Sequence, residues 1–151
     1  MGSKYTTMTD PLYDYVVAHR SGADDLVLDD LRDETEALGD ISRMLSSREQ
    51  GSLLTLLVGA LGVKRAVEVG TFTGYSAICI ARALPEGGKL ICHDINAEWT
   101  GKARTYWERA DVTDKIELRL GPAAETLRCL AGEPELDFAF IDANKDGYDS
   151  Y

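Results

Sequence analysis

Glu68-Val69-Gly70-Thr71-Phe72-Thr73-Gly74-Tyr75-Ser76 predicts, in order, the end of a strand, a tight turn and the start of a helix. Residues 66–69 have strand composition, and residues 75–84 have helical composition up to the proline that follows them. The glycines of the turn let the backbone approach a ligand, and the helix start offers free N–H groups to an anion. A tight turn without a ligand would have the same signature.

The chain around this unit alternates between strands and helices. Strands are expected at residues 66–69, 89–93, 115–120 and 136–141, and helices at 75–84, 98–110 and 122–130. This alternation predicts an α/β fold, a mostly parallel sheet with helices on both faces. The third strand alternates apolar and charged residues, as near a sheet edge, whereas the fourth is apolar on both faces, as in a central strand. We therefore expect missing sequence, a partner chain or a swapped segment beyond the fourth strand.

The residues before this alternation predict helices. Helices are expected at residues 11–20, 24–38 and 47–61, the last capped by Ser46 or Ser47. We expect a single domain over residues 1–151, with a helical segment at 10–62 and an α/β part at 63–151. In the helix at 98–110 the aromatic side chains share one face with small residues, which favours a place in the core.

Composition excludes several classes of partner. The 151 residues carry 26 acidic and 16 basic side chains, for a net charge of −10, and the acids concentrate in residues 10–50. No basic patch could neutralise a nucleic acid or an anionic membrane surface. The longest uncharged stretch, residues 51–63, is too short to span a bilayer. The three cysteines, Cys79, Cys92 and Cys129, are expected to be reduced and buried, which favours a cytoplasmic location.

Polar residues follow the predicted strands, where ligands of open parallel sheets bind. Asp94 comes 20 residues after Gly74 and could accept both hydroxyls of a ribose, or it could hold the start of the next helix. His93 is expected to be a strand-end residue rather than a catalyst. Residues 121–124 could edge an adenine ring. Asp142 could bind a hard divalent cation, and Lys145 could accept a proton if desolvation lowers its pKa. A solvated loop explains residues 142–145 equally well.

Taken together, Glu68-Val69-Gly70-Thr71-Phe72-Thr73-Gly74-Tyr75-Ser76, His93-Asp94-Ile95 and Phe140-Ile141-Asp142-Ala143-Asn144-Lys145 resemble the cation-dependent S-adenosylmethionine O-methyltransferases. This family includes the caffeoyl-CoA and catechol O-methyltransferases. The resemblance covers nearly all of residues 11–151 and implies a Rossmann-like methyltransferase fold preceded by N-terminal helices. Several separated motifs in the right order are far more specific than any one of them.

The resemblance also implies roles for individual residues. The methionine part of the cofactor would be lined by Gly70 and the neighbouring backbone, including Phe72, with Glu68 beneath it. Ser76 would contact the cofactor carboxylate, and Met44 and Ser46 would close over the same end. Asp94 would bind the ribose, Ala123 would lie beside the adenine, and Asp142 would lie at the edge of the cofactor site. Asp142 would also bind Mg²⁺ or another divalent cation, and Lys145 would be the catalytic base. Asn144 departs from the aspartate that is commoner there.

The implied reaction is methyl transfer to a hydroxyl of a catechol-like or phenolic small molecule, with a metal lowering the pKa of that hydroxyl and Lys145 taking the proton. A cytoplasmic homodimer is implied as well. Family members continue past this chain into a region with an Asp-Asn pair that completes the metal site. The chain would then be a fragment of a longer enzyme or a natural short form, and the unprotected apolar fourth strand favours the fragment. The alternatives are a truncated cofactor-binding or protein-interaction domain without catalysis, and a nicotinamide-dependent oxidoreductase. The latter is disfavoured because the turn lacks G-x-G-x-x-G.

Overall fold

The computed structural model describes residues 5–130 and 135–150. In this part of the chain the strands are β1 (Arg65–Val69), β2 (Lys89–Asp94), β3 (Ile116–Leu120) and β4 (Phe138–Ile141). The α-helices are α1 (Asp10–His19), α2 (Leu26–Glu36), α3 (Arg48–Leu61), α4 (Tyr75–Ala83), α5 (Ala97–Arg109) and α6 (Ala123–Thr126). Short 3-10 turns cover Gly39–Met44, Thr113–Lys115, Leu127–Leu130 and Lys145–Ser150. The predicted order of elements is therefore confirmed.

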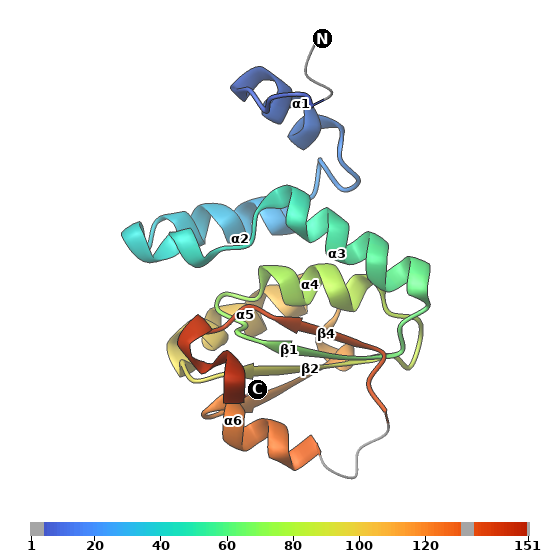
Figure 1. Cartoon of the computed structure of the whole chain (residues 1–151), viewed down its shortest axis with the longest axis vertical. Helices are drawn as coiled ribbons and strands as arrows, with labels where there is room; N and C mark the ends of the chain where they lie inside the picture. Colours follow the sequence, from blue (N-terminus) through green and yellow to red (C-terminus); the bar gives the residue numbers. More distant parts are fainter. Residues whose placement is uncertain (1–4, 131–134, 151) are drawn as a thin grey trace.

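The four strands form one parallel sheet in the order β3-β2-β1-β4. Successive crossovers from β1 to β2 to β3 run in one direction, which places α4 and α5 on the same face. The next connection turns back past β1 to reach β4, so α6 lies on the other face (Figure 1). The chain reverses its direction of winding between β1 and β4, and such switch points are where open α/β sheets bind ligands.

The N-terminal helices form an outer layer. Figure 1 shows α2 and α3 lying over α4, which itself covers the sheet, while α1 stands away from the body. Leu28, Leu31 and Thr35 of α2 and Leu54 and Val58 of α3 are buried in this packing. No residue of α1 is buried. The helical segment is thus part of the same core as the sheet, apart from α1.

The ends of α3 follow the sequence signals. Ser47 precedes the helix, and its side chain accepts a hydrogen bond from the Gln50 N–H at 3.3 Å, so the second of the two predicted caps is the one used. Gly62 ends the helix with φ at 63°, a left-handed conformation that glycine adopts without strain. These two ends fix where the chain enters β1.

The fourth strand pairs only with β1 and is an edge strand of the described sheet, so the expectation that further chain lies beyond it stays a prediction. Three other expectations are wrong. The helix expected at 122–130 divides into α6 and a 3-10 turn. Cys129 is exposed, unlike Cys79 and Cys92, because that short turn lies on the surface. Trp99, expected in the core, is only half-buried because it sits in the first turn of α5, at the mouth of a pocket.

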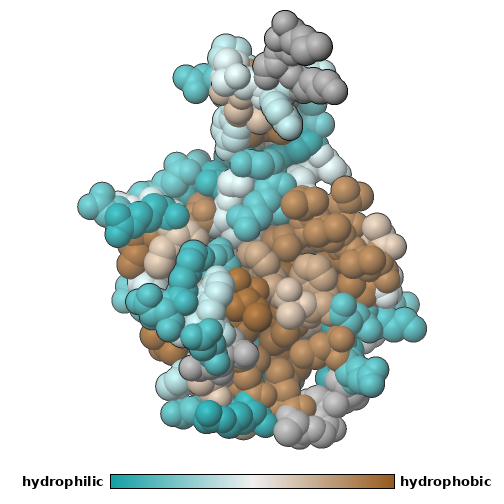
Figure 2. All heavy atoms as spheres, in the orientation of Figure 1, coloured by the Kyte–Doolittle hydropathy of each residue, from teal (hydrophilic) through white to brown (hydrophobic). Residues whose placement is uncertain are grey.

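One face of the molecule is apolar. In Figure 2 a continuous hydrophobic surface extends over α3 toward β4. Its exposed side chains on α3 are Leu53, Leu56, Leu57 and Leu61. Within residues 5–130 and 135–150, none of the helices is long and apolar enough to cross a membrane.

Candidate functional site

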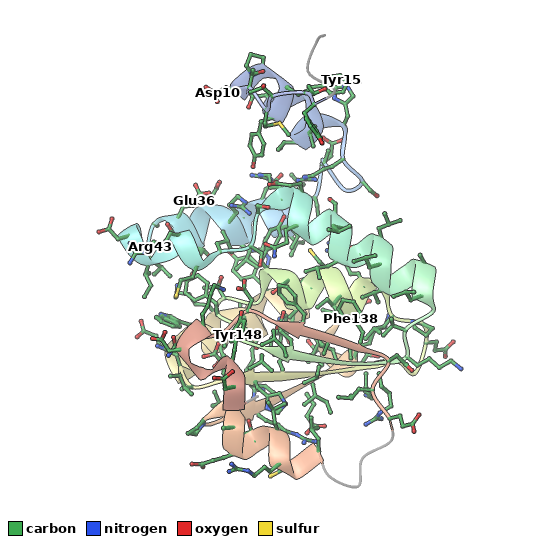
Figure 3. All side chains as sticks on the ribbon, viewed as in Figure 1. Asp10, Tyr15, Glu36, Arg43, Phe138 and Tyr148 are labelled. Carbon is green, nitrogen blue, oxygen red and sulfur yellow. The ribbon has the colours of Figure 1, made fainter. Side chains whose placement is uncertain are left out.

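A pocket of about 980 Å³ opens at the carboxyl ends of the strands. In Figure 3 Phe138 marks the amino end of β4, and Arg43 and Tyr148 lie toward its opposite end, where the pocket is. Every residue predicted for the site lines this pocket except Glu68, which lies below it: Met44, Ser46, Gly70, Phe72, Ser76, Asp94, Ala123, Asp142 and Lys145. The structure therefore brings together residues as far apart in the sequence as Met44 and Lys145.

The turn between β1 and α4 is tightly packed against the end of β4. Gly70 has φ at 94°, and a Cβ there would lie 2.7 Å from the Asp142 carbonyl oxygen. Phe72 also has a positive φ, 52°, which is uncommon for a non-glycine residue. The turn is consequently held in one shape, with its N–H groups gathered on one side.

The Asp94 carboxylate receives those N–H groups. Its Oδ2 accepts hydrogen bonds from the backbone N–H of Thr71 at 2.9 Å and of Phe72 at 2.8 Å. Its Oδ1 accepts one from the Asn96 N–H at 2.8 Å, and Asn96 in turn caps α5. The predicted contact to the start of the next helix is thus present. A carboxylate has about four acceptor positions, so Asp94 retains capacity for a further donor from the pocket.

Glu68 lies fully buried on β1, below the turn. Its Oε2 accepts a hydrogen bond from the Cys92 thiol at 3.4 Å, and its Oε1 has no hydrogen-bond partner. Burial raises the pKa of Glu68 to about 7, against the smaller opposing influence of the Ser76, Cys92 and Thr71 side chains. A buried carboxyl oxygen without a partner is unusual. It is a place where a cationic or N–H-bearing ligand would improve the hydrogen bonding.

His93 points away from Glu68 and joins β2 to α6. Its Nδ1 lies 2.6 Å from the Thr126 Oγ1, and burial, with a smaller effect of Arg119, lowers the pKa of His93 to about 4. The ring is therefore neutral near pH 7. His93 also lines the pocket, and its Nε2 has no hydrogen-bond partner, so its role as a strand-end residue rather than a catalyst stays a prediction.

Lys145 and Asp142 face each other on the opposite rim. The Lys145 Nζ donates a hydrogen bond to the Asp142 Oδ1 at 3.1 Å, and the lysine side chain is 74% exposed. The hydrogen bond to Asp142, followed by that to Tyr148, raises the pKa of Lys145 above its usual value. The expected lowering by desolvation is absent from this structure because the ammonium lies in solvent. Lys145 is therefore protonated at neutral pH.

Sequence reasoning missed one aromatic residue of the pocket. The Trp99 and Phe72 rings pack edge to face, with centroids 5.0 Å apart, and both line the pocket. The available signal was the position of Trp99 in the first turn of the helix that follows Asp94, close to the carboxyl end of β2. The exposed Ile95 lies on the same rim.

The parallel sheet, its switch point and this pocket define a Rossmann-like fold of the S-adenosylmethionine-dependent methyltransferase type. A family model described as O-methyltransferase matches residues 18–151. The chain belongs to the O-methyltransferase family.

Individual relatives agree with this assignment. The chain is 35% identical to caffeoyl-CoA O-methyltransferase 1 of Zea mays, with all of this chain and 60% of the maize protein covered. It is 43% identical to the mouse catechol O-methyltransferase domain-containing protein 1, over 68% of this chain and 40% of the mouse protein. The O-methyltransferase of Bacillus cereus in complex with S-adenosylhomocysteine (SAH) superposes with a TM-score of 0.83 at 32% identity, over 91% of this chain and 63% of that one. The chain thus spans about half of the length of these curated relatives.

Proposed function

We propose that the chain binds S-adenosylmethionine (SAM) in the pocket at the carboxyl ends of the strands and serves methyl transfer to a hydroxyl group. The observation that carries this proposal is the convergence on one pocket of the Asp94 carboxylate, which has one acceptor position left, and an uncapped helix start, with the partly unpaired carboxyl of Glu68 buried below them. The solved relatives that were crystallised with SAH or SAM support it.

The pocket residues fit the parts of SAM in turn. No side chain caps α4, so the N–H groups at its start are available to the cofactor carboxylate, with Ser76 beside them. Glu68 would lie below the cofactor ammonium. Asp94 would accept a ribose hydroxyl with its remaining lone pair, Ala123 would flank the adenine, and Met44 and Ser46 would close the methionine end.

Bound SAM would supply an electrophilic methyl group on its sulfonium sulfur. This chain would contribute orientation, by holding that methyl toward the rim that carries Lys145 and Asp142. An acceptor hydroxyl placed at this rim would displace the Asp142 contact of Lys145. Lys145 would have to lose its own proton to solvent, which desolvation by the bound acceptor would favour, before its amine could receive the hydroxyl proton. A phenolic or catechol-like acceptor suits this site because its hydroxyl ionises more readily than an aliphatic one.

A divalent cation does not fit the described residues as a complete site. Residues 5–130 and 135–150 contain no group of three or more His, Cys, Asp and Glu side chains that could hold a metal ion. Asp142 remains a proposed ligand, but one carboxylate that is already paired with Lys145 is a weak site for Mg²⁺. No step of the proposed reaction is therefore assigned to a metal.

The proposal is tested by titrating the chain with SAH and then with SAM and catechol. SAH should bind in the pocket, and SAM with a phenolic acceptor should yield SAH and a methylated product. Binding without product formation would favour the alternative, a cofactor-binding domain without catalysis. Failure of SAH to bind would refute the proposal.

Replacing Asp94 with alanine is expected to weaken SAH binding about 10- to 100-fold, because the variant loses both the ribose contact and the anchor of the Thr71 and Phe72 N–H groups. Isothermal titration calorimetry measures this change. Asp30→Ala is the matched control, since Asp30 is an exposed aspartate on α2 that pairs with Arg109 outside the pocket. Equal affinities of Asp94→Ala and the unchanged chain would rule out the ribose role.

A further inference from the structure

Arg32 on α2 contacts two elements that border the pocket. Its Nη2 donates a hydrogen bond to the Ser46 carbonyl oxygen at 2.7 Å. Its guanidinium carbon lies over the Tyr75 ring, 5.0 Å from the centroid. Its Nη1 is 3.5 Å from the Glu36 Oε1, and its side chain is 14% exposed. A single guanidinium therefore joins α2, the segment at residues 43–46 and the first residue of α4.

These two contacts define one end of the pocket. Residues 43–46 line the pocket from one side, and Tyr75 and Ser76 line it from the start of α4. Between Met44 and the start of α3 the backbone is extended, and Leu45 is the residue of this segment that packs against the core. The Arg32–Ser46 hydrogen bond is thus a second anchor for a segment that has little regular structure of its own.

The contacts require arginine in particular. A planar guanidinium can stack on a ring and donate in its own plane at the same time, whereas the lysine ammonium is a compact point charge that cannot satisfy both geometries. At 14% exposure the charge is largely removed from water, which strengthens both contacts. Arg32 does not line the pocket itself.

We propose that Arg32 is a positioning residue that fixes residues 43–46 against the start of α4 and thereby sets the affinity for the methionine end of the cofactor. This inference rests on the proposed function, because it concerns the same pocket. It assigns to the acidic helix α2 a task at the site, beyond covering α4.

The test compares Arg32→Ala and Arg32→Lys with the unchanged chain. The matched control is Arg109→Ala, because Arg109 also stacks on a tyrosine, Tyr106, at 4.8 Å and pairs with α2 through Asp30, but lies outside the pocket. Two ligands are titrated: SAH, which has the methionine part, and adenosine, which lacks it. Amide hydrogen exchange of residues 43–47 is measured without ligand.

Arg32→Ala should weaken SAH binding about tenfold, leave adenosine binding within about twofold, and speed exchange at residues 43–47. Arg32→Lys should give an SAH affinity and exchange rates between those of Arg32→Ala and the unchanged chain. Arg109→Ala should change neither affinity nor the exchange rates. Equal weakening of SAH and adenosine, or unchanged SAH affinity with unchanged exchange, would overturn the inference. If the unchanged chain bound neither ligand, the proposed function would fail, and the exchange rates would still decide whether Arg32 anchors the segment.

Discussion

Replacing Gly74 with alanine is expected to destabilise the folded chain by about 2–5 kcal/mol, the sum of backbone strain and overpacking. Gly74 has φ at 89°, and a Cβ at this position would lie 2.7 Å from both the Ala103 Cβ and the Trp107 Nε1. Neither neighbour can move easily, because both are buried in the face of α5 that packs on the core. Urea unfolding followed by tryptophan fluorescence measures the free energy of unfolding.

Gly59 provides the matched control for this substitution. It lies in the exposed part of α3, and a Cβ there would meet no heavy atom within 4 Å. Gly59→Ala should therefore stabilise the chain by about 0.5–1 kcal/mol, because alanine loses less backbone entropy in a helix. If Gly74→Ala were as stable as Gly59→Ala, the described packing of the turn against α5 would be wrong.

Replacing Glu68 with glutamine is expected to stabilise the folded chain by about 3 kcal/mol at pH 8.5 and to have little effect near pH 5. Burial raises the pKa of Glu68 from 4.5 to about 7, so the folded state favours the protonated carboxyl. The contribution of Glu68 to stability is complete below pH 4.5 and is lost as the pH rises through 7. Glutamine cannot ionise, so the variant escapes this loss. Unfolding curves at several pH values give the comparison.

Glu34→Gln is the control for the sign of this effect. Hydrogen bonds from Lys102 and then Tyr106 lower the pKa of Glu34, so its contribution is present above its usual pKa and is lost as the pH falls. Its replacement should give no gain in stability at pH 8.5. A gain of similar size in both variants would show that the effect at Glu68 does not come from its burial.

The β1–turn–α4 unit and the cap of α3 could be predicted because their signals are local. A positive-φ glycine and a serine at a helix start act on their own neighbours in the chain. The position of β4 could not be predicted in this way. Its side chains are apolar on both faces, which indicates that both faces of the strand favour burial. This pattern does not indicate which strands pair with it, because pairing depends on the other strands of the sheet.

Some residues of the candidate site could likewise be predicted from the sequence, and others could not. Asp94 and Asp142 could be predicted because Asp94 ends β2 and Asp142 directly follows β4, and the carboxyl ends of parallel strands meet at one edge. Arg32 and Trp99 could not, because their contacts arise from the way α2 and α5 pack on α4 and the turn. The spacing of apolar residues along a helix does not indicate which side chains meet when helices pack together. The protonation of Lys145 depends on its exposure, which a loop sequence does not specify.

The close approach of Gly70 to Asp142 links the two halves of the pocket mechanically. With the Asp142 carbonyl oxygen 2.7 Å from the position of a Cβ on Gly70, the turn between β1 and α4 and the loop that carries Lys145 have no free space between them. A displacement of either backbone must move the other. If the proposed cofactor and acceptor bind on the two sides of this contact, we expect their binding to be thermodynamically linked, so that the affinity for one ligand depends on the presence of the other.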